Sequence, residues 1–209
     1  MKRWIFLGAT IGAVLAIMGV IYRTQTPMPK REEKNQLYVK AENIIVLAGP
    51  INDTSVGLVL AQINQLRLGG HKYALLVIDS PGGNVISGNM LINVMRSTPM
   101  TIDTYCAAMC FSMAAFIFEE GKTRYMAPSS ILMFHPARVG LNGNMEDVQE
   151  LLTTFKNMLE DLFTKVLQKV PQNKQEKFLA SRYREIYLLP KEAKELNLMD
   201  KETVLFADE

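Results

Sequence analysis

The sequence has little of what several classes of protein need. Lys and Arg number 23 against 21 Asp and Glu, so no charge excess favours binding to nucleic acid. The 209 residues include two cysteines and two histidines. Cys106 and Cys110 lack a second Cys/His cluster that would complete a metal site, so we interpret them as small core residues. We therefore expect no metal, no cofactor and no nucleic-acid partner.

A long apolar run does stand near the N-terminus. Residues 4–22 carry no charged side chain, and about 20 such residues cross a bilayer as a helix. A cleaved signal peptide would have a shorter apolar core and a small-residue cleavage site, and nothing after Gly19 offers one. The sequence thus predicts an uncleaved membrane anchor over 1–23. The very short tail before it favours an orientation with the rest of the chain on the exported side.

The chain beyond the anchor has the pattern of an α/β domain. Residues 24–40 are polar and charged with two prolines, which is typical of a linker. The remaining residues, 41–209, are enough for one domain of ordinary size, and they contain no internal repeat. Short apolar runs alternate here with helical patterns, which predicts a mainly parallel sheet of βα units. We expect strands over 43–48, 73–79, 101–106 and 131–134, and helices over 53–67 and 84–96.

A long amphipathic helix is predicted in the second half of the domain. It starts at Asn144, and its apolar residues keep helical spacing for about six turns, to about residue 169. The plain interpretation is that this helix packs on its own sheet. Shorter elements are expected after it: a polar helix over 172–184, a strand over 185–188 and a helix over 190–196.

Two side chains stand where a hydroxyl nucleophile and its base are needed. Ser112 lies near the start of a small, apolar run that suits a buried helix, and His135 ends the strand pattern at 131–134. A base removes the hydroxyl proton, and backbone N–H groups at a helix start stabilise an oxyanion. Each feature alone is more common as a packing residue. The other histidine, His71, lies in a turn that we expect to be exposed, which makes His135 the better base.

The turn Ser80-Pro81-Gly82-Gly83 strengthens the catalytic interpretation of this pair. It directly follows the expected strand 73–79 and precedes a helical pattern. Glycines at such a turn allow the backbone to approach a ligand closely, with N–H groups pointing outward.

Three blocks of sequence stand in order along the chain: Ile78-Asp79-Ser80-Pro81-Gly82-Gly83, Cys110-Phe111-Ser112-Met113-Ala114-Ala115 and Met133-Phe134-His135-Pro136. Together they resemble the Clp peptidase family (ClpP), part of the wider ClpP/crotonase superfamily, over about residues 41 to 204. The resemblance implies a spiral of βα units with a projecting long helix, here preceded by one transmembrane helix. It also implies a serine endopeptidase that acts on polypeptides and a homo-oligomer built through the long helix. An ATPase unfoldase is a further partner that the resemblance leaves open.

The resemblance also implies roles for single residues. Ser112 matches the nucleophile, His135 the general base, and the backbone N–H groups of Gly83 and Met113 the oxyanion donors. Family members usually carry Asp two residues before an aromatic side chain, and here that position is Glu185. Glu can orient an imidazole as Asp does. The alternative is that Glu185 is a surface charge and the site is a Ser–His dyad.

Some positions depart from the family pattern. Ala108 replaces a common Gly, Phe111 replaces a small residue, and the segment from Gly121 to Tyr125 is short. These changes indicate a divergent, membrane-tethered branch. Three other functions stay open: a signal-peptide-peptidase-like enzyme with a Ser–Lys dyad, a crotonase-type acyl-CoA enzyme, and a membrane scaffold without catalysis.

Overall fold

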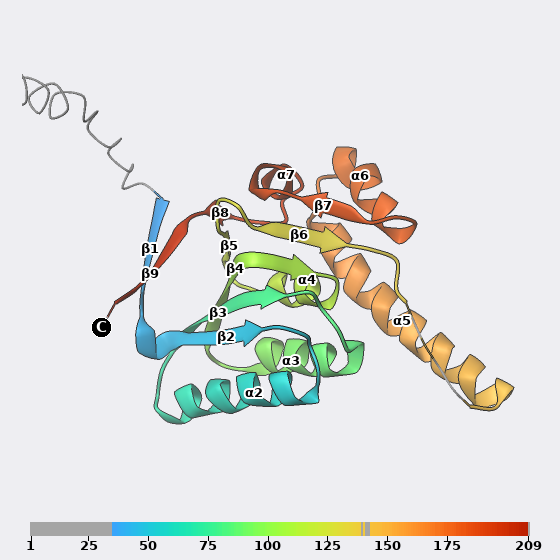
Figure 1. The fold of residues 1–209 in the computed structure, drawn as a ribbon, viewed down its shortest axis with the longest axis horizontal. Coiled ribbons are helices and arrows are strands. Elements are labelled where there is room, and N and C mark those ends of the chain that lie inside the picture. Colours follow the sequence, from blue (N-terminus) through green and yellow to red (C-terminus); the bar gives the residue numbers. More distant parts are fainter. Residues whose placement is uncertain (1–34, 139, 141–142, 209) are drawn as a thin grey trace, which may run out of the picture. The chain divides into compact units, whose positions relative to one another are not determined.

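The fold is built on a largely parallel sheet (Figure 1). The structure is a computed structural model, and it describes residues 35–138, 140 and 143–208. Five parallel strands lie side by side in this order: β2 (Ile44–Ala48), β3 (Tyr73–Ser80), β4 (Thr101–Phe111), β5 (Arg124–Met126) and β8 (Lys201–Glu202). Strand β4 is long enough to pair with β5 through Thr104–Cys106 and with β6 (Ile131–Phe134) through Met109–Phe111. Strand β7 (Ile186–Leu188) adds to β6 antiparallel. The predicted α/β fold with a parallel sheet is confirmed.

Helices pack on one face of this sheet. They are α2 (Asp53–Leu68), α3 (Val85–Ser97), α4 (Met113–Phe118), α5 (Met145–Lys169), α6 (Gln175–Leu179) and α7 (Pro190–Glu195). Side chains from these helices and from the facing side of the strands form the larger core cluster. Both cysteines are buried within it and unpaired, which confirms their interpretation as core residues.

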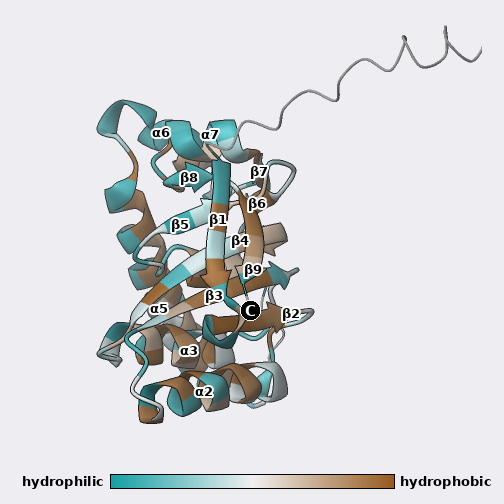
Figure 2. Ribbon diagram, turned by 90° about the vertical axis from the view of Figure 1, so that its left-hand side faces the viewer, coloured by the Kyte–Doolittle hydropathy of each residue, from teal (hydrophilic) through white to brown (hydrophobic). Residues whose placement is uncertain are grey.

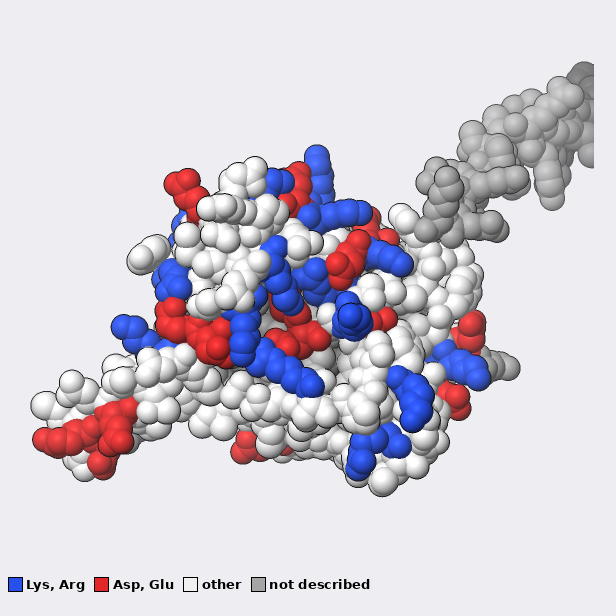
Figure 3. All heavy atoms as spheres, turned by 180° about the vertical axis from the view of Figure 1, so that it is seen from behind, with Lys and Arg blue, Asp and Glu red and all other residues white. Residues whose placement is uncertain are grey.

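Helix α5 projects from the body of the domain (Figure 1). Its buried side chains, Leu162 and Val166, both belong to its second half. Met145 at its start is 79% exposed. The first turn of α5 also carries Glu146 and Asp147, so the projecting end of the helix is acidic. Basic and acidic side chains are mixed over the rest of the face that Figure 3 shows.

A two-stranded ribbon covers part of the other face of the sheet. Strand β1 (Gln36–Lys40) pairs in parallel with β9 (Val204–Asp208), and Figure 2 looks onto this ribbon. Val39 packs there against Leu75, Tyr105 and Tyr125. The compact unit therefore begins at Asn35. The last five residues of the segment that we predicted to be a linker belong to the fold, because their alternating apolar side chains meet this sheet face.

Three further differences from the sequence prediction concern local structure. Strand β4 continues to Phe111, beyond the expected end at 106, because Met109–Phe111 pair with β6 and Ser80 pairs with Cys110. The expected helix at 172–184 is broken into short 3-10 turns around α6. Strands β5, β8 and β9 were not predicted, since runs of two to five residues carry little periodicity.

The predicted anchor at 4–22 lies outside the described residues. Within the described part, no helix combines the length and the hydropathy that a bilayer crossing requires.

Candidate active site

Ser112 occupies a strained backbone position between β4 and α4. Its φ of 55° and ψ of −123° are rarely adopted by residues other than glycine. Such a conformation costs about 1–3 kcal/mol and persists only where the surroundings enforce it. Here the Ser112 N–H donates to the carbonyl of Met133 at 2.8 Å, while the following residue starts α4. The turn therefore presents the Ser112 side chain at the junction of a strand and a helix.

The glycine turn after β3 lies directly against this backbone. A Cβ on Gly82 would come within 2.6 Å of the Phe111 carbonyl oxygen and 2.8 Å of the Ser112 Cβ. Gly83 forms a parallel bridge with Ile51, whose N–H and C=O bond to the residues on either side of Gly83. In a parallel bridge the middle residue directs its own N–H to the opposite side. The Gly83 N–H is therefore turned away from Ile51.

A second backbone donor stands at the start of α4. Met113 is the first residue of this helix, so its N–H has no acceptor within the helix. Gly83 and Met113 both line the same cavity as Ser112. The arrangement is suited to binding an oxyanion.

His135 follows β6, the strand next to the second half of β4. Phe111 pairs with Met133 in parallel register, so the residues that follow the two strands meet at the same edge of the sheet. His135 lines the cavity together with Ser112. Its Nδ1 lies 2.6 Å from the carbonyl oxygen of Pro136. Because a carbonyl only accepts, Nδ1 carries the proton, and Nε2 of the neutral ring keeps a free lone pair.

The cavity has a volume of about 940 Å³ and mixed walls. Helices α4 and α5 supply apolar side chains, namely Met113, Phe116, Phe155, Leu159 and Phe163. Arg182 stacks 4.2 Å above the Phe163 ring and donates two hydrogen bonds to Glu160, at 2.5 and 2.7 Å. Hydrogen bonding from Arg182 lowers the pKa of Glu160. This pair thus holds α5 against the residues before β7 at the cavity wall.

Glu185 lies outside the residues that line the cavity. Its Oε1 accepts a hydrogen bond from Arg138 Nη2 at 3.1 Å, and its Oε2 accepts one from the Tyr187 hydroxyl at 2.7 Å. The bond to Glu185 raises the pKa of Tyr187. The antiparallel register between β6 and β7 ends with the pair Phe134 and Ile186, and His135 and Glu185 are the residues that directly adjoin this pair. The two residues thus adjoin the same strand ends, but the carboxylate is bound to other partners.

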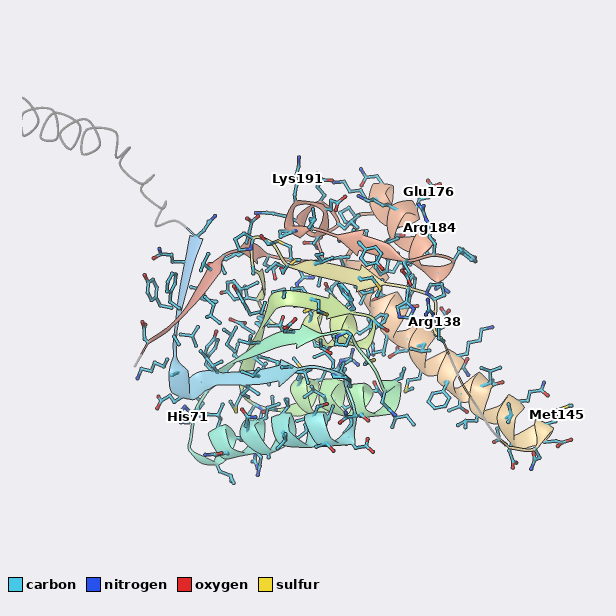
Figure 4. The ribbon with its side chains drawn as sticks, viewed as in Figure 1. His71, Arg138, Met145, Glu176, Arg184 and Lys191 are labelled. Carbon is cyan, nitrogen blue, oxygen red and sulfur yellow. The ribbon has the colours of Figure 1, made fainter. Side chains whose placement is uncertain are left out.

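The second histidine does not share this site. His71 Nδ1 lies 2.8 Å from Asn43 Oδ1. Figure 4 shows His71 at the opposite end of the sheet from Arg138. His71 does not line the cavity that contains Ser112.

A buried charge cluster behind the site was not found from the sequence. Glu119, fully buried at the end of α4, accepts hydrogen bonds from Arg124 and Lys169, and Arg124 also binds Asp200. Burial raises the pKa of Glu119 despite the two cations. Burial alone would raise the pKa of Asp200 too, but bonds from Arg124 bring it below its usual range. The apolar run 113–118 ends at Glu119, and nothing in the sequence around it indicates that this carboxylate is buried.

Within the described ranges, no three His, Cys, Asp or Glu side chains gather as a metal site would require. Among known protein families, the model of the Clp protease family matches residues 29–204. The match covers most of the 209 residues, and it includes the turn at Gly82, Ser112 and His135. The chain belongs to the Clp protease family.

Proposed function

We propose that this protein is a membrane-anchored serine endopeptidase with Ser112 as nucleophile and His135 as general base. Membership of the Clp protease family implies peptidase activity on polypeptide substrates. The observation that supports the finer assignment is the single cavity lined by Ser112, His135, Gly83 and Met113. The strained backbone of Ser112 adds to it, since such strain clusters at active sites.

The reaction follows from this geometry. Nε2 of His135 takes the proton of the Ser112 hydroxyl as Oγ attacks the carbonyl carbon of the scissile peptide bond. The carbonyl oxygen becomes an oxyanion and accepts from the N–H groups of Gly83 and Met113. The imidazolium then gives its proton to the leaving nitrogen, and the C–N bond breaks. Water repeats the sequence on the acyl-enzyme and restores Ser112.

Glu185 is the proposed third residue of the site. The register of β6 and β7 supports this role, because His135 and Glu185 directly adjoin its last pair, Phe134 and Ile186. A carboxylate there would stabilise the imidazolium that forms during each proton transfer.

Anchoring and assembly complete the proposal. The anchor is residues 1–23, inferred from the uncharged run at 4–22. The very short tail before this run favours an orientation with the rest of the chain on the exported side. Exposed apolar side chains on the projecting part of α5, Met145, Leu151 and Leu152, support a homo-oligomer formed through this helix. We propose the spiral arrangement of βα units that is typical of the superfamily for the whole domain.

The test is labelling of the full-length protein by a fluorophosphonate, together with hydrolysis of a fluorogenic peptide. Ser112→Ala should abolish labelling, and both Ser112→Ala and His135→Ala should lower turnover by about 10⁴-fold or more. Ser97→Ala changes an exposed serine on α3 and should behave as wild type. Peptidase activity that survives in Ser112→Ala would rule out the assignment, and a wild-type protein that neither labels nor turns over would indicate a scaffold.

A further inference from the structure

We propose that Arg138 is a positioning residue that withholds Glu185 from His135, so that the resting site orients its base through the Pro136 carbonyl. The proposal rests on the proposed function. Two contacts support it. Arg138 Nη2 lies 3.1 Å from Glu185 Oε1, and His135 Nδ1 lies 2.6 Å from the Pro136 oxygen.

The ends of β6 and β7 place Glu185 and His135 next to the same residue pair. Strands β6 and β7 pair Leu132 with Leu188, Met133 with Tyr187 and Phe134 with Ile186. Continued by one step, this register would set Glu185 opposite His135, where directly opposed side chains have Cβ atoms about 4.5–5.5 Å apart. Rotation of the Glu185 side chain would then exchange one partner for the other.

Both carboxylate oxygens of Glu185 are engaged elsewhere. Arg138 follows His135 by three residues and lines the cavity, while Tyr187 follows Glu185 by two and donates its hydroxyl proton to Oε2 at 2.7 Å. Arg138 is thus the positive charge that competes with His135 for Glu185. While Arg138 binds the carboxylate, the only acceptor for His135 Nδ1 among the described residues is the neutral carbonyl of Pro136.

The ion pair between Arg138 and Glu185 is weak. The side chain of Arg138 is 80% exposed and that of Glu185 40% exposed, and an exposed ion pair shifts an equilibrium by only about two- to fivefold. Opening this pair therefore changes the fraction of molecules with Glu185 on His135 by a similar factor. A carboxylate on Nδ1 stabilises the imidazolium that forms in each proton transfer, so the fraction of molecules with Glu185 on His135 turns over faster.

Other titratable side chains line the same cavity. Lys156 and Glu160 lie on α5, and Arg182 and Tyr183 lie before β7. Arg182 is bound to Glu160 through both of its terminal nitrogens. None of these groups bonds to Glu185, so a change of Arg138 alone tests the competition.

The experiment compares kcat and KM for full-length Arg138→Gln, Glu185→Gln and the double variant. Arg138→Gln should raise kcat about two- to fivefold with unchanged KM. Glu185→Gln should lower kcat, and the double variant should match it. Arg138→Lys should keep values near wild type, since it retains the charge.

Arg184→Gln is the matched control, because Arg184 is an exposed arginine beside Glu185 that does not line the cavity. It should leave all values unchanged. An Arg138→Gln variant without a gain, or with the same gain when Glu185 is already Gln, would overturn the proposal. A raised KM alone would assign Arg138 to substrate binding and would overturn it too. Fluorophosphonate labelling of Ser112 accompanies every variant: its absence from wild type as well would contradict the proposed function.

Discussion

At the scale of single residues, the site depends on how closely two backbones approach. Gly82 adopts a φ of 89° and lies against the peptide groups of Phe111 and Ser112. A side chain at this point would push the glycine turn away from the candidate nucleophile. The position of the Gly83 N–H relative to Ser112 would then change, although Gly83 itself is unaltered. Small displacements of this kind weaken oxyanion stabilisation strongly.

Gly82→Ala should therefore lower peptidase turnover by about 100-fold or more, the loss typical of an impaired oxyanion site. Its added Cβ meets the Phe111 carbonyl at 2.6 Å, which the backbone must relieve by moving. The measurement is kcat/KM beside circular dichroism, which should show a folded protein.

Gly57→Ala is the control for this substitution. Gly57 lies inside α2 with nothing within 4 Å of an added Cβ. It should keep full activity and stabilise the protein by about 0.5–1 kcal/mol, because alanine favours a helix interior. Equal activity in the two variants would mean that the glycine turn is not close to the reacting groups.

At the scale of secondary structure, α4 is fixed at both of its ends. Ser112 and the glycine turn surround its start, while the buried charges of Glu119, Arg124 and Lys169 hold its end. One carboxylate oxygen of Glu119, Oε1, is the buried side-chain atom without a hydrogen-bond partner among the residues that the structure describes. Breaking a buried ion pair by removing one partner is costly, since it leaves a desolvated charge.

Lys169→Met should destabilise the protein by about 2 kcal/mol at pH 7, because Glu119 loses one of its two cations. The raised pKa of Glu119 means that its charged form is already disfavoured in the folded state. Such a carboxyl favours folding at low pH and opposes it as pH rises through its folded-state pKa. The cost of the substitution should therefore shrink when urea unfolding is measured towards pH 5.

Lys165→Met provides the comparison on the same helix. Lys165 forms an exposed pair with Asp161, one turn away at 2.6 Å, and such pairs contribute about 0.5 kcal/mol. A similar cost for the two variants, or one that does not change with pH for Lys169→Met, would contradict the role given to the buried cluster.

At the scale of the whole molecule, the described domain has the sheet between helices on one face and the β1–β9 ribbon on part of the other (Figures 1 and 2). The ribbon joins the first described residues to the last ones in a parallel pairing of five residues. An isolated two-stranded sheet is marginally stable in water. Packing of Leu37, Val39 and Leu205 on the sheet therefore holds the ribbon in place.

A protein that begins at Ala41, without β1, should be about 3 kcal/mol less stable than one that begins at Asn35. The estimate counts about 1.5–3 kcal/mol for each lost apolar side chain that is buried. Two tyrosines of the sheet, Tyr105 and Tyr125, would also become exposed. Urea unfolding of the two proteins side by side measures the difference. Equal midpoints would mean that the ribbon adds nothing to the fold.

Local patterns in the sequence determined the class of fold and most of the candidate site. Alternating strand and helix periodicities depend on neighbouring residues only, and so does the turn chemistry of Gly82 and Gly83. The same patterns set Ser112 before a helix and His135 after a strand. The roles of these residues remain proposals, but the structure confirms that they line one cavity.

The tertiary structure decided what depends on residues far apart in the chain. Strand β1 pairs with β9, Glu119 meets Lys169, and the Glu185 carboxylate binds Arg138. The periodicity of the sequence does not predict such partners, because these contacts form only once the folded backbone brings distant residues together. The family resemblance assigned Glu185 to the orientation of His135. In the tertiary structure the carboxylate binds Arg138, and the imidazole bonds to the Pro136 carbonyl.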